Sequence, residues 1–223
     1  MAWEERMATA TDAQILTLAQ WFSPAFPVGG FHFSHGLEWE ITQGAVFDAD
    51  RLERWIGDML CHGAGRNDAI LLAAAWQAET KAALDEIDAT ARALAGTAER
   101  RRETEEMGAA FARITGALAG RDDAPLCYPV AVGRAARVSD LPQGLTARMY
   151  LQAVVGNLAS VGMRLGPVGQ TGGQQIIARL APLCLQVAED SAHGDLDQLG
   201  GAVFAGDIAA MRHETQYSRI FRT

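Results

Sequence analysis

The residues best suited to metal chemistry in this chain of 223 residues are two histidines and a cysteine. His32 and His35 lie three positions apart in the segment FHFSHG, and Cys61 directly precedes His62. Residues three apart on a helix share a face, so two imidazoles there could meet one metal ion. No third ligand is close in sequence, and the neighbouring glycines and prolines leave the backbone at His32 undefined. We therefore favour packing roles for the histidines, and a small apolar role for Cys61.

No arrangement of residues along the chain predicts catalysis. The segment GPVGQTGG lacks the Lys-Ser/Thr pair of a phosphate-binding loop, which favours a turn between two helices. Glu38 and Glu40 are two apart and would not face each other on a helix. Glu38 and Asp68 could each be a buried carboxylate paired with an arginine. Because no nucleophile, base and oxyanion donor come together, we expect no catalytic residue, no cofactor, and a protein that binds or scaffolds others.

The composition favours closely packed helices. Hydrophobic residues make up 49% and charged residues 21%, which is typical of a folded chain. The chain holds 41 alanines, and alanine is the best helix former. Basic character comes almost wholly from arginine, since Lys81 is the single lysine. The net charge of −8 disfavours a nucleic-acid partner, because phosphate binding needs a basic surface.

Apolar residues recur at helical spacing along most of the chain, and no long segment alternates as a strand would. Thr11 and Gln14 can form a capping box at the first helix. We expect helices over residues 14–22, 35–42, 48–62, 67–94, 99–120, 129–138, 148–165 and 174–190. The charged start of helix 99–120 is interpreted as a solvated surface with Glu–Arg pairs.

These elements predict an all-α protein, built as a single compact multi-helix bundle over residues 1–223. The apolar helix 148–165 is expected at its centre, and residues 1–11 are expected to be flexible. The segment SPAFPVGGFHFSHGLE, from Ser23 to Glu38, is rich in aromatic residues and poor in charge. We expect it to pack against the bundle rather than extend into solvent.

The C-terminal tail, residues 211–223, has the sequence MRHETQYSRIFRT and combines three arginines with aromatic and aliphatic residues. Such residue types are enriched in interface anchors, whereas frayed termini are usually small and polar. The tail could fold back on its own domain or dock on a partner. Both interpretations bury its apolar residues, and both stay open.

Cysteine usage and hydropathy predict a cytoplasmic protein. Cys61, Cys127 and Cys184 are widely scattered, which is unlike a disulfide framework or a zinc ribbon. The first residues are polar and acidic, so we expect no secretory signal. No stretch approaches the ~20 apolar residues of a membrane helix, and we expect no membrane association.

Four segments together resemble the UreF family of urease accessory proteins, in that family's order and spacing. They are SPAFPVGGFHFSHGLEWEITQGAV, the pair Asn67-Asp68, MYLQAVVGNLASVGMRLGPVGQTGGQ, and MRHETQYSRIFRT. The resemblance implies an all-helical cytoplasmic chaperone of metallocentre assembly that is not itself an enzyme. It also implies a homodimer whose partners are the accessory protein UreD or UreH, the GTPase UreG and apo-urease. In that complex nickel is inserted into urease, and the GTPase is modulated.

The resemblance also implies roles for individual residues. The partner-binding residues would be Arg212, His213, Glu214, Tyr217, Ser218, Arg219, Phe221 and Arg222. The residues that match the family's structural motifs are Ser23, Pro24, Pro27, Gly29, Ser34, His35, Gly36, Glu38, Gly169 and Gln170. Ile220 stands where leucine is common, and Thr223 where serine is common. A nickel-binding carrier that uses His32, His35 and Cys61 is the alternative, and a helical enzyme without a known motif is the third hypothesis.

Overall fold

The computed structural model describes residues 10–201 and 203–222, and its regular elements there are all helices. The α-helices are α1 (Asp12–Trp21), α2 (Leu37–Thr42), α3 (Ala49–His62), α4 (Ala64–Gln77), α5 (Lys81–Leu94), α6 (Ala98–Leu118), α7 (Tyr128–Val138), α8 (Gln143–Leu165), α9 (Gln170–Asp190) and α10 (Phe204–His213). Two short 3₁₀ turns, η1 (Gly30–His32) and η2 (Leu196–Gln198), lie in the connections. The all-α prediction is confirmed. Among the described residues, no helix is long and apolar enough to cross a membrane.

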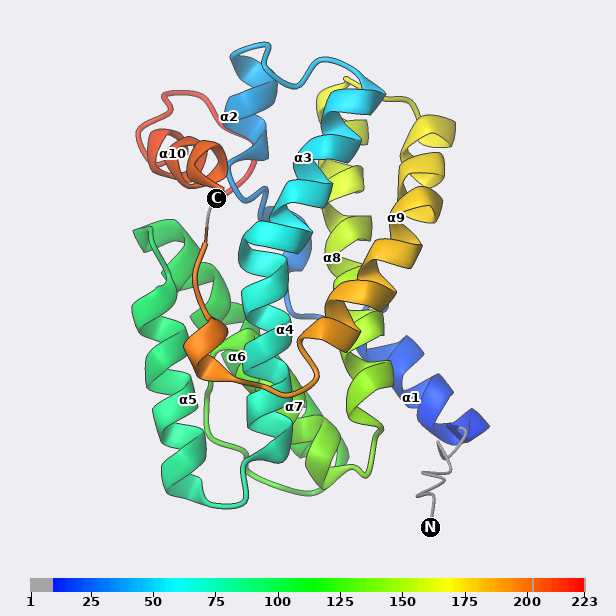
Figure 1. Cartoon of the computed structure of the whole chain (residues 1–223), viewed down its shortest axis with the longest axis vertical. Helices are drawn as coiled ribbons and strands as arrows, with labels where there is room; N and C mark the ends of the chain where they lie inside the picture. Colours follow the sequence, from blue (N-terminus) through cyan, green and yellow to red (C-terminus); the bar gives the residue numbers. More distant parts are fainter. Residues whose placement is uncertain (1–9, 202, 223) are drawn as a thin grey trace.

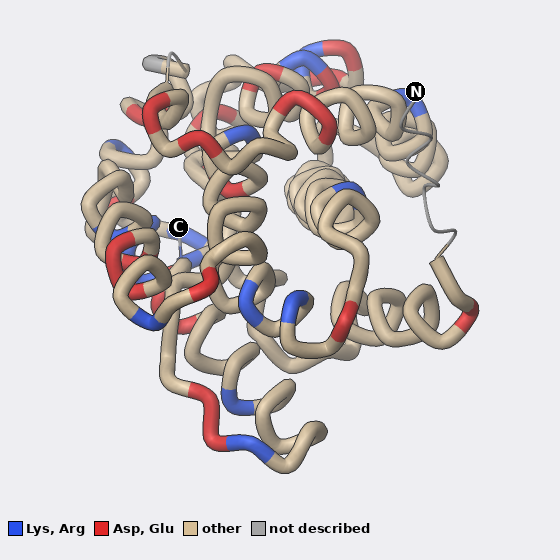
Figure 2. Tube along the Cα trace, turned by 60° about the horizontal axis from the view of Figure 1, so that its bottom comes forward, with Lys and Arg blue, Asp and Glu red and all other residues tan. Residues whose placement is uncertain are grey.

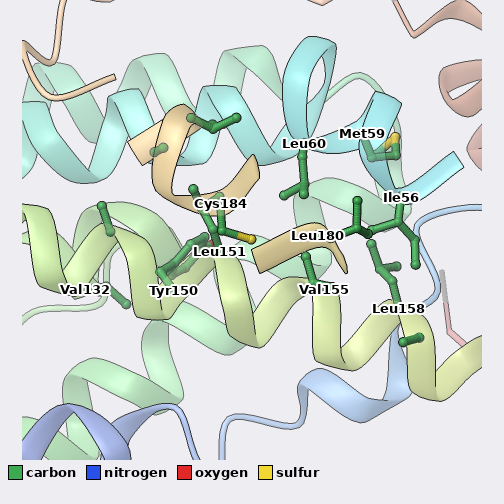
Figure 3. Packing of buried hydrophobic residues seen from close by; sticks show 14 of the residues in the cluster. Ile56, Met59, Leu60, Val132, Tyr150, Leu151, Val155, Leu158, Leu180 and Cys184 are labelled. Atoms are coloured by element: carbon green, nitrogen blue, oxygen red, sulfur yellow. The ribbon is translucent and has the colours of Figure 1, made fainter. Parts of the chain in front are cut away.

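Helix α8 lies at the centre of the bundle, as its apolar sequence predicts. It packs against α9, α4, α2, α3 and α7, and α3, α8 and α9 run side by side (Figure 1). Leu151, Val155 and Leu158 of α8 are almost fully buried and meet Ile56 and Leu60 of α3 in the core (Figure 3). Each fully buried side chain of this size contributes roughly 1.5–3 kcal/mol to folding, so α8 holds the surrounding helices together.

Alanines and glycines let neighbouring helices approach closely, most clearly where α4 crosses α7. Ala73 and Ala75 of α4 are buried, and Gly133 of α7 faces the same helix. A Cβ atom added at Gly133 would lie 2.2 Å from the carbonyl oxygen of Leu72. This contact therefore requires a residue without a side chain.

Several helix boundaries differ from the sequence prediction. The expected helix 67–94 is two helices, α4 and α5, because the chain turns away after Gln77 and Thr80 caps the start of α5. The helix expected from His35 begins at Leu37, since His35 and Gly36 both adopt positive φ angles, of 54° and 82°. At α1 the capping box between Thr11 and Gln14 is confirmed.

The aromatic segment that follows α1 packs down on the bundle, as expected. Phe26 and Phe33 are buried in it, and Phe26 contacts Phe111 of α6 with ring centroids 5.5 Å apart. Residues 1–11 were expected to be flexible. Residues 1–9 of this segment lie outside the described residues, and Thr11 caps α1.

Candidate functional site

Helix α10 and the C-terminal tail fold back on the protein's own N-terminal segment. α10 packs against α2 at one end of the molecule (Figure 1). The approach is close at Gly36, where an added Cβ atom would lie 2.6 Å from the amide nitrogen of Ala210. Beyond α10 the chain returns to the same segment, and the amide of Arg222 donates a hydrogen bond to the carbonyl of His32 at 2.7 Å. The structure shows the tail folded back on its own domain, and docking of the tail on a partner stays a prediction.

His213, at the end of α10, lies between two carboxylates and is completely buried. Its Nε2 atom is 3.1 Å from Glu38 Oε2, and its Nδ1 atom is 2.9 Å from Glu99 Oε2. The Glu38 carboxylate also accepts hydrogen bonds from the amides of Ile220 and Phe221, at 2.7 and 2.9 Å. Two elements far apart in sequence, α2 and α6, thus hold the end of the chain.

Helix α6 presents a face of glutamates to the tail and to the N-terminal segment. Glu99, Glu103 and Glu106 follow one another at spacings of four and three, so they share one side of the helix. Glu99 pairs with Arg219, and Glu106 lies 3.6 Å from the guanidinium of Arg222. The tail is therefore held by charge as well as by packing.

The eight candidate partner-binding residues divide into a buried and an exposed group. His213 is buried, and Phe221 is 3% exposed beneath the guanidinium of Arg164, which lies 5.2 Å from the ring centroid. Tyr217 is fully exposed. Also exposed are Arg212, Glu214, Ser218, Arg219 and Arg222. The neighbouring Ile208, Met211 and Ile220 are each more than half exposed, which leaves an apolar surface on α10 and the tail.

Next to the tail contacts lies a buried set of charges, here called the central ion cluster: His35, Asp68, Arg100, Glu103 and Tyr150. The guanidinium of Arg100 donates to both oxygens of Asp68, at 3.0 and 2.8 Å, and lies 3.0 Å from Glu103. His35 Nε2 is 3.0 Å from the same glutamate, and the Tyr150 hydroxyl donates to Asp68 at 2.7 Å.

Two cavities, of about 230 and 530 Å³, are both lined by His35, Asp68, Arg100 and Glu103 of this cluster. Burial alone raises the pKa of Glu103, but the charges and hydrogen bonds of His35 and Arg100 outweigh it and lower that pKa to about 2. Burial raises the pKa of Tyr150 well above its ordinary value, and the neighbouring Asp68 adds to this. Glu103 is thus anionic and Tyr150 is a neutral donor at neutral pH.

The comparisons with known proteins give one consistent result. A family model described as UreF matches residues 46–181. The urease accessory protein UreF of Ruegeria pomeroyi is 52% identical over 97% of this chain and 100% of its own length. Proteins of the same name from Cereibacter sphaeroides and Roseobacter denitrificans are 53% and 51% identical, over 95% and 98% of this chain and 99% and 97% of theirs. The chain belongs to the UreF family of urease accessory proteins.

The residues that match the UreF structural motifs shape turns and helix starts. The Ser23 hydroxyl accepts a hydrogen bond from the amide of Ala25, and Gly29 adopts a φ angle of 80° before η1. Ser34 is fully buried, and its hydroxyl accepts from the amide of Glu38 at 3.5 Å. Pro24 and Pro27 lie in the bends between them, and Gly169 and Gln170 form the N-cap and first residue of α9. His35, Gly36 and Glu38 carry the contacts described above.

The metal-ligand candidates of this UreF-family chain lie in different surroundings. His32 contacts the ring of Phe31, with centroids 3.8 Å apart, and His35 pairs with Glu103. Cys61 lies on α3, where burial raises the pKa of its thiol. Within residues 10–201 and 203–222, His, Cys, Asp and Glu side chains form no group of three or more that could hold a metal ion.

Sequence reasoning missed the part of this site that α6 provides. The charged start of α6 is not simply a solvated surface, because Glu103 is buried and Arg100 reaches Asp68. The spacing of Glu99, Glu103 and Glu106 could have indicated that they share one side of a helix. The pairing of Asp68 with an arginine is confirmed, whereas Glu38 pairs with His213 rather than with an arginine.

Proposed function

We propose that this chain bridges the accessory protein UreD or UreH and the GTPase UreG in the complex that inserts nickel into apo-urease. The observation that carries this proposal is the apolar surface of α10 and the tail. There Tyr217, Ile220 and Met211 are exposed, although Glu38 holds the amides of Ile220 and Phe221. Aromatic and arginine side chains of this kind are the usual anchors of protein interfaces.

The proposed role is that of a scaffold in the cytoplasm, without an enzymatic activity or a resident cofactor of its own. We propose that residues 1–223 act as one domain, and that two copies associate, as the resemblance to the family implies. This chain would modulate the GTPase if its surface binds one nucleotide state of UreG more tightly than the other. Only such a difference in affinity shifts the equilibrium between the two states. Nickel is cargo in this scheme, and membership of a family of urease accessory proteins supports the link to urease.

The experiment is a pull-down with purified UreD or UreH and UreG, with and without GTP. Tyr217→Ala removes a fully exposed side chain, and we expect it to weaken capture of UreD or UreH at least tenfold. Leu185→Ala on α9 is the matched control, because Leu185 is an exposed apolar residue outside the tail. Equal capture by the Tyr217→Ala variant and the wild type would exclude the tail as the docking surface.

A point variant is a sharper test than deletion of residues 211–223. Deletion removes His213 and leaves the buried carboxylates of Glu38 and Glu99 without that partner. An uncompensated buried charge is strongly destabilising, so loss of binding on deletion would mix two causes.

A further inference from the structure

We propose that Glu38 is a positioning residue that sets the conformation of the C-terminal tail, and so decides which tail side chains a partner protein meets. The proposal rests on the proposed function, in which the tail docks on UreD or UreH. In addition, we propose that the Glu38 carboxylate, nearly two hundred residues earlier in the chain, sets the shape of this docking surface. Glu38 itself need not touch the partner.

The contacts of Glu38 show why it can do this. Its carboxylate is 3% exposed and accepts from the amides of both Ile220 and Phe221, while its Oε2 atom also faces His213. No other acceptor is recorded for these two amides in the described part of the chain. A buried carboxylate needs such partners, and a buried amide needs such an acceptor, so each side of the contact stabilises the other.

Fixing two consecutive amides also fixes which way their side chains point. Phe221 is directed inward and is 3% exposed, whereas Ile220 next to it is 65% exposed. Tyr217 precedes them in the same tail and is fully exposed. If Glu38 released the two amides, Phe221 would no longer be held in its pocket, and a partner would have to order the segment before binding it.

The surface presented in this way predicts the chemistry of its partner. The tail exposes the side chains of three arginines, Arg212, Arg219 and Arg222, together with the apolar side chains of Tyr217 and Ile220. A complementary protein surface would offer an apolar pocket with carboxylates at its rim.

The test begins with Glu38→Gln, which keeps the size of the side chain. It replaces one acceptor oxygen with the NH2 of an amide, which cannot accept a hydrogen bond. Glu40→Gln is the matched control on the same helix, since Glu40 forms no ion pair with the tail among the described residues. We expect the amides of Ile220 and Phe221 in the free chain to exchange with solvent about tenfold faster or more in Glu38→Gln. In Glu40→Gln and the wild type they should be equally protected; equal protection in all three proteins would overturn the proposal.

Affinity for UreD or UreH is the second measurement, and it separates this proposal from the function beneath it. We expect Glu38→Gln to weaken binding about tenfold or more, and Glu40→Gln to leave it unchanged. If Glu38→Gln loses amide protection but keeps its affinity, the positioning role is overturned. Tyr217→Ala then still tests whether the tail is the docking surface. If Tyr217→Ala binds normally, the tail is not the docking surface and the proposed function fails, although the exchange result would still show whether Glu38 holds the tail.

Discussion

Glu103 shows how a single buried charge is stabilised in this protein. Its side chain is 3% exposed, yet its pKa is lowered to about 2, since His35 and Arg100 both lie 3.0 Å from its Oε1 atom. Its Oε2 atom is buried without a hydrogen-bond partner among the protein groups described, and the residue lines two cavities. The fold therefore depends on the ionised form of this glutamate.

This dependence predicts how stability changes with pH. Because the pKa of Glu103 is lower in the folded state than its ordinary 4.5, its contribution is complete above about pH 4.5 and is lost as the pH falls toward 2. The contribution is on the order of a few kcal/mol. Glu103→Gln should lower the free energy of unfolding at neutral pH and flatten its decrease over that acid range, as measured by urea unfolding. An unchanged pH profile in the variant would contradict this.

At the scale of elements, the bundle depends on helices that approach one another through small residues. Among its closest contacts is the crossing of α4 and α7, where Gly133 lies against the backbone of Leu72. Burial of Ala73, Ala75 and Ala136 around it leaves no space into which an added methyl group could move. The high alanine content of the sequence is explained by this packing as well as by helix propensity.

Gly133→Ala tests this packing. The new methyl carbon would lie 2.2 Å from the carbonyl oxygen of Leu72, so α4 and α7 must separate, which we expect to cost about 1–3 kcal/mol or more of unfolding free energy. Gly144→Ala in α8 is the control, because nothing lies within 4 Å of its added carbon, and its stability should change by less than about 1 kcal/mol. Equal midpoints of thermal unfolding for the two variants would show that the crossing can open freely.

At the scale of the whole molecule, the tail differs from the rest of the surface in charge. The chain carries −8 overall, and acidic residues are spread over its helices (Figure 2). The tail has three arginines and one glutamate. Arg219 and Arg222 pair with glutamates of α6, while Arg212 forms no ion pair with any other described residue. A basic end on an acidic molecule favours approach to a carboxylate-rich partner.

Arg212→Gln should therefore slow association with UreD or UreH more than it changes dissociation. Charges at the rim of an interface act mainly on the association rate, and we expect a decrease of roughly twofold to tenfold at low salt. The difference from the wild type should shrink between about 0.05 M and 0.5 M salt, because screening removes long-range attraction. Rates from surface plasmon resonance check this, and an effect confined to the dissociation rate would contradict it.

Most of the helices, their apolar faces, the packing of the segment from Ser23 to Glu38, and the family could be predicted from the sequence. All of these follow from local spacing or from motifs. The recurrence of apolar residues every three or four positions indicates a helix within a few turns, without reference to distant parts of the chain. Its failures were also local, as at Gln77, where one expected helix is two.

Which charged side chains pair with one another could not be predicted from the sequence and is set by the packing of the helices. Glu38 and His213 are 175 positions apart, and Asp68 and Arg100 are 32 apart, so no periodicity in the sequence connects them. The sequence predicts that Glu103 is a solvated residue of a charged run, whereas in the structure this residue of α6 pairs with His35. Burial makes each such pair obligatory, since a charge without its partner is costly in the interior, but the identity of the partner is set by the packing of whole helices.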